Sequence, residues 1–278
     1  MPDGHQAAQV TAGGYVGSRI DASRPHIARV YDYLLGGKDN FDADRELGDK
    51  IKIALPGVRL GVEQQRAVLR RAVRHLVAEA GIRQIIDIGS GLPTAGNVHE
   101  VALEVAPGTR VVYVDNDPIV LAHARALMAN NKTTIAIGGD ARHPAEILGN
   151  PELNELIDLE QPVGLLLCGI LHHILDDEDP AGITAAYRAA LPSGSYVFIH
   201  HLVANGDPSV AAAQAELQQG TGRGQFRPKE QIEQFFEGLE LVEPGLVSVA
   251  EWRPDPDTPR VEANPILRLA VAGLGRKL

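Results

Sequence analysis

Between residues 84 and 200, short apolar runs alternate with longer segments whose apolar residues recur at helical spacing. An unbroken apolar run of about five residues is typical of a strand that is buried on both faces of a parallel sheet. Strands that alternate with helices in this way indicate an α/β fold. The pattern predicts parallel strands at 84–88, 110–114, 133–137, 163–167 and 195–199, with helices near 118–129 and 179–190.

The segments on either side of this alternation follow their own patterns. Ser23 is a suitable N-cap for a first helix, and Pro25 suits its first turn. The last two apolar segments follow each other without a long crossover, so an antiparallel pair at the sheet edge is predicted. We expect helices over about 23–36, 61–80, 208–218 and 228–238, and strands within 239–249 and 265–272.

The first predicted strand ends in an acid and two glycines, Asp87, Gly89 and Gly91. Glycines at this position let the backbone turn sharply and approach a ligand without a Cβ in the way. The second strand also ends in an acid, Asp115, which can accept both hydroxyls of a ribose. Together these residues predict a site for a nucleoside-containing cofactor at the carboxyl edge of the sheet.

Two classes of cofactor share this acid and glycine turn. A dinucleotide site requires a third glycine three positions after the second, whereas this chain has Thr94 at that position, preceded by Pro93. This departure disfavours NAD and FAD. Asp140 follows the third strand, where an acid can meet an adenine amino group. With the antiparallel closing pair, these features resemble the class I S-adenosylmethionine-dependent methyltransferases.

Four blocks of sequence make the resemblance more specific. They read RPHIARVYDYLLGGKDNF at 24–41, DIGSGLPT at 87–94, VYVDNDP at 112–118 and FFEGLELVEPG at 235–245. They are similar to the actinobacterial S-adenosyl methyltransferase family, once catalogued as a domain of unknown function, over about 23–272. The first block is specific, whereas the glycine turn alone is not. The resemblance implies the fold and the cofactor, S-adenosylmethionine, whose product is S-adenosylhomocysteine. It does not imply a methyl acceptor.

The resemblance also implies roles for individual residues. Asp87, Gly89 and Gly91 are expected at the amino-acid part of the cofactor, where Arg66 could pair with the carboxylate or else face solvent. Further residues are expected at the ribose, at the adenine and beneath the methionine part. In that order they are Asp115 with Asn116, Asp140 with Ala141, and Cys168 with Gly169.

The N-terminal block, rich in aromatic, charged and glycine residues, is interpreted as a lid over the cofactor. A closing lid would exclude water and orient the acceptor. The alternative is a helix end followed by an exposed loop. Within the lid we expect Tyr31, Tyr33, Lys38 and Asn40 to shape the acceptor pocket.

Two histidine pairs, His172-His173 and His200-His201, follow the fourth and fifth predicted strands. A neutral imidazole is a suitable base near pH 7, so His172 and His200 are candidate general bases. Because neighbours in sequence diverge, at most one member of each pair is expected to face the pocket. The alternatives are histidines that pack or cap helices, and a metal site with a carboxylate such as Asp176.

Composition narrows the choice of partners. The net charge of −10 argues against non-specific binding to nucleic acid, which requires a basic surface. The single cysteine rules out an internal disulfide and a cysteine-rich metal site. No apolar run approaches the ~20 residues of a membrane span, and the first 18 residues lack the apolar stretch of a signal peptide. We therefore expect a cytoplasmic protein with a small-molecule acceptor; the oligomeric state is not predicted.

The sequence thus predicts one Rossmann-like class I methyltransferase domain over 60–278, preceded by a disordered tail at 1–18 and a helical lid at 19–59. The sheet should have seven strands, mostly parallel, with helices on both faces. The expected reaction is methyl transfer to oxygen or nitrogen of a small molecule. Two alternatives stay open at this point: a module that binds S-adenosylmethionine or its product without catalysis, and an NAD-dependent oxidoreductase.

Overall fold

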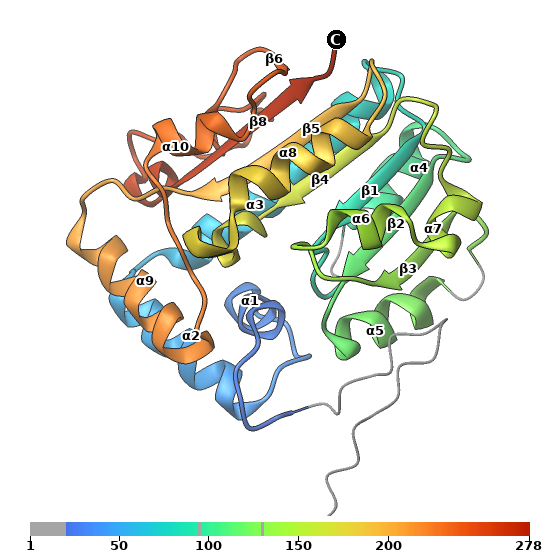
Figure 1. Ribbon diagram of the computed structural model, residues 1–278. Coiled ribbons are helices and arrows are strands. Elements are labelled where there is room, and N and C mark those ends of the chain that lie inside the picture. Colours follow the sequence, from blue (N-terminus) through green and yellow to red (C-terminus); the bar gives the residue numbers. More distant parts are fainter. Residues whose placement is uncertain (1–20, 94–95, 129–130) are drawn as a thin grey trace, which may run out of the picture.

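A mixed sheet of eight strands runs through the part of the chain that the computed structural model describes, residues 21–93, 96–128 and 131–278 (Figure 1). The spatial order is β3-β2-β1-β4-β5-β8-β6, and β7 also pairs with β8. The strands are β1 (Gln84–Ile88), β2 (Arg110–Asp115), β3 (Thr134–Gly138), β4 (Gly164–Cys168), β5 (Tyr196–Leu202), β6 (Glu240–Leu241), β7 (Val247–Ser248) and β8 (Ala270–Arg276).

The first five strands are parallel, so their carboxyl ends meet at one edge of the sheet. β1 lies between β2 and β4, and the chain order therefore reverses direction on either side of it. A crevice at the carboxyl ends beside such a reversal is where open α/β sheets bind ligands. The edge beyond β5 is antiparallel, because β8 pairs with β5 over its whole length.

Helices cover both faces of the sheet (Figure 1). α3 (Val58–Ala78), α4 (Val98–Val105) and α5 (Pro118–Met128) pack on one face, where Leu76, Ile85 and Phe198 are completely buried. The other face carries α6 (Pro144–Leu148), α7 (Pro151–Leu156), α8 (Pro180–Ala190) and α10 (Lys229–Gln234). Strand residues alternate between the two cores, as Ile85 and Ile86 do, because successive side chains of a strand point to opposite faces.

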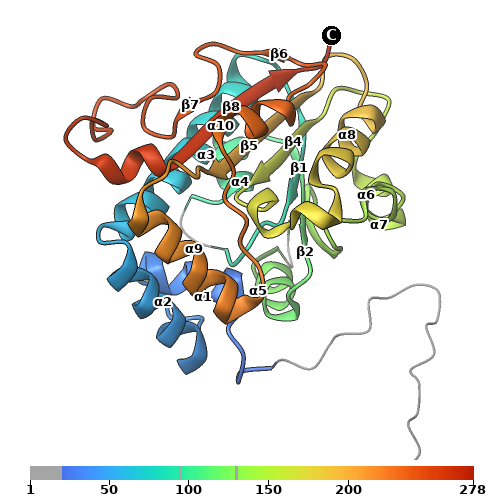
Figure 2. The ribbon, with the colours of Figure 1, turned by 60° about the vertical axis from the view of Figure 1, so that its left-hand side comes forward.

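A third apolar cluster lies beyond the carboxyl edge. It is built from α1 (Ile27–Leu35), α2 (Asp42–Ala54) and α9 (Pro208–Thr221), which we call the helical cap. α2 and α9 lie side by side although more than a hundred residues separate them in sequence (Figure 2). The cap therefore combines the N-terminal segment with one from the second half of the chain.

Buried ion pairs fix the start of α1 to the sheet. The carboxylate of Asp44, fully buried, accepts hydrogen bonds from Arg29 Nε at 2.9 Å and from the His26 backbone N–H at 2.8 Å. Asp117, in the loop after β2, receives His26 Nδ1 at 2.9 Å and Arg29 Nη1 at 3.4 Å. Although burial alone opposes it, the hydrogen bond from His26 lowers the pKa of Asp117. The cap is thus held next to the loop that follows Asp115.

The predicted class of fold is confirmed, with corrections in detail. Eight strands are found within the described residues instead of seven, because Pro244 and Gly245 divide 239–249 into β6 and β7. Proline cannot donate a ladder hydrogen bond. Ser23 is not the N-cap of the first helix, since His26 occupies that position. The predicted disordered tail at 1–18 lies outside the described residues. No helix that the structure describes is long and apolar enough to cross a bilayer.

Candidate active site

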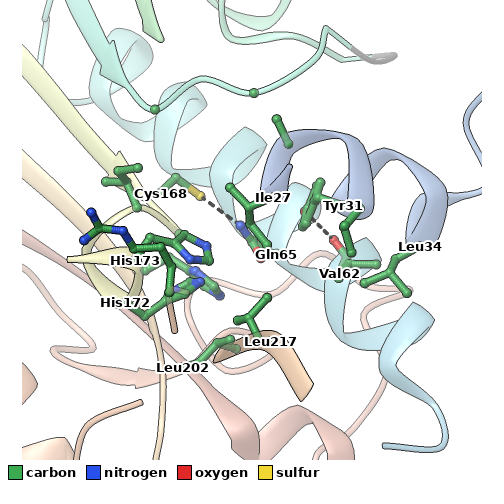
Figure 3. A pocket seen from close by; sticks show the side chains of 18 of the residues that line it. Ile27, Tyr31, Leu34, Val62, Gln65, Cys168, His172, His173, Leu202 and Leu217 are labelled. Atoms are coloured by element: carbon green, nitrogen blue, oxygen red, sulfur yellow. Dashed lines mark hydrogen bonds between the residues drawn. The ribbon is translucent and has the colours of Figure 1, made fainter. Parts of the chain in front are cut away.

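A cavity of about 420 Å³ lies between the carboxyl edge of the sheet and the helical cap. Its polar end is formed by residues at and just beyond the carboxyl ends of β1 to β5, and its apolar end by the cap (Figure 3). This volume falls in the range of natural small-molecule sites, roughly 300–1,000 Å³. Every cofactor residue predicted from the sequence lines it: Arg66, Asp87, Gly89, Gly91, Asp115, Asn116, Asp140, Ala141, Cys168 and Gly169.

The glycine turn after β1 exposes its main chain to the cavity. Gly89 and Gly91 have φ angles of 69° and 68°, in the left-handed region that favours glycine. A Cβ on Gly89 would lie 2.7 Å from the Ile170 side chain, whereas one on Gly91 would meet no atom within 4 Å. The turn is held by the Gly91 N–H, which donates to Asp115 Oδ2 at 2.8 Å. Gly91 therefore leaves room for a ligand directly above the turn.

Opposite charges meet beside this turn. Asp87 is buried, and burial raises the pKa of its carboxyl to about 7, with Asp115 adding to the shift and Arg66 opposing it. Arg66 Nε is buried and has no hydrogen-bond partner among the described residues. A buried carboxyl beside a guanidinium whose Nε has no partner can bind the ammonium and carboxylate of an α-amino acid.

Asp115 offers a second polar contact surface. Its carboxylate is buried and accepts from the backbone N–H groups of Gly91 at 2.8 Å and Asp117 at 2.9 Å. Burial raises the pKa of Asp115, while these two hydrogen bonds oppose the increase. Each carboxylate oxygen has a further lone pair, so the group can still accept hydroxyl hydrogen bonds from a ligand.

Asp140 lines the cavity as predicted, but a neighbour already holds its carboxylate. Arg142 Nε donates to both of its oxygens, at 3.0 and 3.1 Å. Arg142 also pairs with Glu178, which binds Arg223 of the segment after α9. The hydrogen bond from Arg223 lowers the pKa of Glu178 to about 2, although burial opposes it. This chain of ion pairs connects the loop after β3 to the cap.

Cys168 and Gly169 form the floor of the cavity at the end of β4. Burial raises the pKa of the Cys168 thiol to about 12, so the sulfur is an uncharged thiol at neutral pH. Gln65 of α3 approaches from the opposite wall, with its amide nitrogen 4.0 Å from Cys168 Sγ (Figure 3). Gly169 has a φ angle of 79°, in the left-handed region that favours glycine.

The histidines gather more closely than the sequence predicts. His172, His173 and His200 all line the cavity, so the expectation of one residue from each pair is wrong for the first pair. His200 and His201 lie within β5 and not beyond it, because the pairing with β8 continues to Leu202. The ring centroids of His172 and His173 are 4.3 Å apart, and those of His172 and His200 are 6.3 Å apart.

Burial keeps these imidazoles neutral. It lowers the pKa of His173 and of His200 to about 3 each, and it lowers the pKa of His172 well below the usual value. His172 Nδ1, His173 Nδ1 and both ring nitrogens of His200 are buried without a hydrogen-bond partner among the described residues. Asp176 pairs with Arg227 at 2.7 Å. No cluster of metal-binding side chains occurs in the described part of the chain.

The four predicted lid residues divide into two groups. Tyr31 lines the cavity and donates its hydroxyl to the Val62 carbonyl at 3.0 Å. Tyr33, Lys38 and Asn40 do not line it. The Tyr33 hydroxyl donates to Asp49 on the outer side of the cap, and Asn40 is buried and donates to Asp32 at 2.7 Å. Lys38 is exposed in the turn between them.

Several lining residues were not predicted from the sequence. Gln65 lies one position before Arg66 and carries no separate signal. Residues of α9 and of the segment before β8 reach the cavity through tertiary packing, and no local pattern of the sequence could indicate this. They are Val210, Ala213, Leu217, Thr221, Ile266 and Leu269.

Comparisons with known proteins agree with this geometry. The family model described as S-adenosyl methyltransferase matches residues 14–278. A crystal structure from Thermobifida fusca YX, of a protein assigned as a methyltransferase, is 47% identical over 92% of this chain and 96% of its own, with a TM-score of 0.88. A DUF574 family protein from Streptomyces avermitilis MA-4680 is 42% identical over 94% of this chain and 100% of its own, with a TM-score of 0.89.

More distant structures share the fold. Human N-acetylserotonin methyltransferase, solved in complex with S-adenosylmethionine, is 14% identical over 91% of this chain and 63% of its own, with a TM-score of 0.50. No protein in the curated set matches this chain.

Proposed function

The chain belongs to the S-adenosyl methyltransferase family, and from this premise we propose that it methylates an oxygen or nitrogen atom of a small molecule. The cofactor is S-adenosylmethionine, which supplies a methyl group on a positively charged sulfur atom. The family accounts for the nucleoside site and disfavours the oxidoreductase alternative. The net charge of −10 disfavours nucleic acid as the acceptor, and we expect the protein to act in the cytoplasm.

The residues present fit this cofactor. Asp87 and Arg66, whose Nε has no partner among the described residues, would hold the ammonium and carboxylate of the methionine part. Asp115 would accept hydrogen bonds from the ribose hydroxyls. The open space above Gly91 would leave room for the methionine part of the cofactor. Asn116 and Ala141 would flank the adenine, with Asp140 held in place by Arg142.

The protein's contribution to the reaction is then mainly geometric. The cavity would hold the acceptor next to Cys168 and Gly169, with the helical cap over the carboxyl edge. Orientation of this kind can supply roughly 7–11 kcal/mol of the barrier. His172, His173 and His200 line the cavity and carry ring nitrogens that are unpartnered among the described residues, so they are the candidate acceptors of the proton.

One observation favours an enzyme over a module that binds the cofactor without catalysis. The cavity does not end at the cofactor residues, but continues past the histidines into the helical cap. A sensor of S-adenosylmethionine requires no such additional space. The test is to incubate the protein with S-adenosylmethionine and a panel of phenols, alcohols and amines, and to measure formation of S-adenosylhomocysteine. Turnover that depends on an added acceptor supports the enzyme, whereas tight cofactor binding without turnover on any acceptor favours the sensor.

Cofactor binding is expected to depend on pH through Asp87. The carboxyl has a pKa of about 7 in the free protein, and the ligand's cations favour its ionised form. Binding should therefore release a proton below pH 7, and the affinity should rise about tenfold between pH 5.5 and 7.5 and then level off. Calorimetric titration in buffers with different heats of ionisation measures how many protons are released when the cofactor binds.

Asp87→Asn is the matched test for this assignment, because it retains the shape of the side chain and removes the titration. The variant should bind more weakly at pH 7.5 and show a flat profile over the same range. Asp158→Asn, in the loop before β4, should retain the wild-type profile. An unchanged pH dependence in Asp87→Asn would assign the titration to another group.

A further inference from the structure

Beyond the histidines, the cavity enters an apolar chamber inside the helical cap. Its wall comes from α1, α2, α3, α9 and the segment before β8, which are brought together only in the folded chain. Figure 3 shows Leu202 and Leu217 below the histidines, and Ile27, Tyr31 and Leu34 facing them. We define the apolar chamber by Ile27, Val30, Tyr31, Leu34, Ile51, Leu55, Val58, Val62, Leu202, Val210, Ala213, Leu217, Thr221, Phe226, Ile266 and Leu269.

None of the residues that define the chamber carries a charge. The two hydroxyls among them are already engaged, since Tyr31 donates to the Val62 carbonyl at 3.0 Å and Thr221 donates to the Leu217 carbonyl at 2.7 Å. Arg66 and Arg223 line the same cavity outside the chamber. Among the chamber residues themselves an ion would lose its hydration without gaining a partner, which costs several kcal/mol or more. The chamber therefore selects uncharged, apolar molecules.

The boundary between the chamber and the cofactor residues is polar. His172, His173 and His200 present four buried ring nitrogens without a hydrogen-bond partner among the described residues. A buried polar atom without a partner costs roughly 1–3 kcal/mol, so a cluster of them indicates a site whose ligand completes the hydrogen bonds. A neutral imidazole can accept a hydrogen bond from a hydroxyl.

We propose that the acceptor is an uncharged apolar phenol whose ring occupies the chamber and whose hydroxyl binds the imidazoles of His172, His173 and His200. This inference rests on the proposed methyltransferase function. A phenol suits these bases better than an aliphatic alcohol, because burial makes each imidazole a weak base and a phenol has the more acidic proton.

The chemistry balances without another reactant. The phenol oxygen forms the new bond to the methyl carbon while the carbon–sulfur bond breaks and leaves its electron pair on sulfur. The phenol proton passes to an imidazole nitrogen. One positive charge thus moves from sulfur to the imidazole, and the total charge of the buried site does not change. The imidazolium then releases its proton to solvent as the products leave.

Binding to the protein saturated with S-adenosylhomocysteine tests the inference without requiring turnover. The probes are 2-naphthol, naphthalene, which lacks the hydroxyl, and 2-naphthoate, which carries a charge at neutral pH. Measured by calorimetry at pH 7.5, 2-naphthol should bind about tenfold or more tightly than either of the other two.

Variants locate the site. Ala213 is buried in α9 and lines the chamber, so Ala213→Phe should fill it and weaken 2-naphthol binding about tenfold or more. Ala215→Phe, on the exposed side of the same helix, is the matched control. His172→Phe should reduce the preference for 2-naphthol over naphthalene about fivefold or more, whereas His143→Phe, at an exposed histidine, should leave it unchanged. Affinity for S-adenosylhomocysteine should stay within about twofold in all four variants.

The outcomes separate the two proposals. Failure of S-adenosylhomocysteine to bind the wild-type protein would remove the proposed function and this inference with it. Binding of S-adenosylhomocysteine without 2-naphthol, or equal binding of 2-naphthoate, would overturn the phenol alone. Unchanged 2-naphthol binding in Ala213→Phe would overturn the placement of the ring in the chamber. The comparison of the three probes on the wild-type protein stands even where a variant does not fold.

Discussion

Asp115→Ala should lower the affinity for S-adenosylmethionine and for S-adenosylhomocysteine by about 100-fold or more. A hydrogen bond to a charged group contributes about 1.5–3 kcal/mol, and a ribose offers two hydroxyls to this carboxylate. The substitution also removes the acceptor of the Gly91 N–H at 2.8 Å, which holds the glycine turn against the end of β2. Both losses act on the same ligand, so a large effect is expected.

The measurement is calorimetric titration of the variant next to Asp257→Ala, an exposed aspartate in the segment before β8. The control should retain wild-type affinity. Thermal unfolding of each variant shows whether the turn or the whole domain is disturbed. Wild-type affinity in a folded Asp115→Ala protein would mean that the ribose binds elsewhere.

Arg227→Ala should lower the free energy of unfolding by about 2–6 kcal/mol, because it leaves two main-chain carbonyls without their donor, at roughly 1–3 kcal/mol each. Arg227 is only 2% exposed. Its guanidinium donates to the Leu171 carbonyl at 3.0 Å and the Ile174 carbonyl at 2.7 Å, and it pairs with Asp176. These carbonyls flank His172 and His173, so the arginine also holds the turn that presents the imidazoles.

Denaturant unfolding of the variant and of Arg276→Ala measures this effect. Arg276 is exposed at the end of β8, and its loss should change the stability by no more than about 0.5 kcal/mol. The Arg227 variant should also lose binding of 2-naphthol, because the histidine turn loses its support. A decrease in stability below about 1 kcal/mol would show that water replaces the guanidinium without cost.

The sequence predicts the cofactor half of the site well because that half is local. Each predicted strand ends within a residue or two of a side chain that reaches the cavity. Asp87 lies near the end of β1, and Asp115 is the last residue of β2. Because the strands are parallel, their pairing alone places these carboxyl ends at one edge of the sheet. β5 extends beyond its predicted end because β8, seventy residues later, continues to pair with it through His200 and His201.

The acceptor half depends on packing between distant segments. α9 meets α2 only in the folded chain, and the residues that face the chamber, such as Ala213 and Leu217, carry no polar signature. From the sequence alone, the aromatic and charged residues of the N-terminal block are expected to line the acceptor pocket. However, Tyr33 and Asn40 stabilise the cap itself through Asp49 and Asp32. The sequence does not show whether a polar side chain of the lid points into the cavity, because this depends on how its helix packs on the rest of the protein.

The central claim is that the cavity binds S-adenosylmethionine, and the most direct test is calorimetric titration of the purified protein with S-adenosylmethionine, S-adenosylhomocysteine and NAD. We predict that the first two bind to one site per chain and that NAD does not bind. Binding of NAD alone, or of none of the three, would contradict the assignment of Asp87, Arg66 and Asp115 to this cofactor.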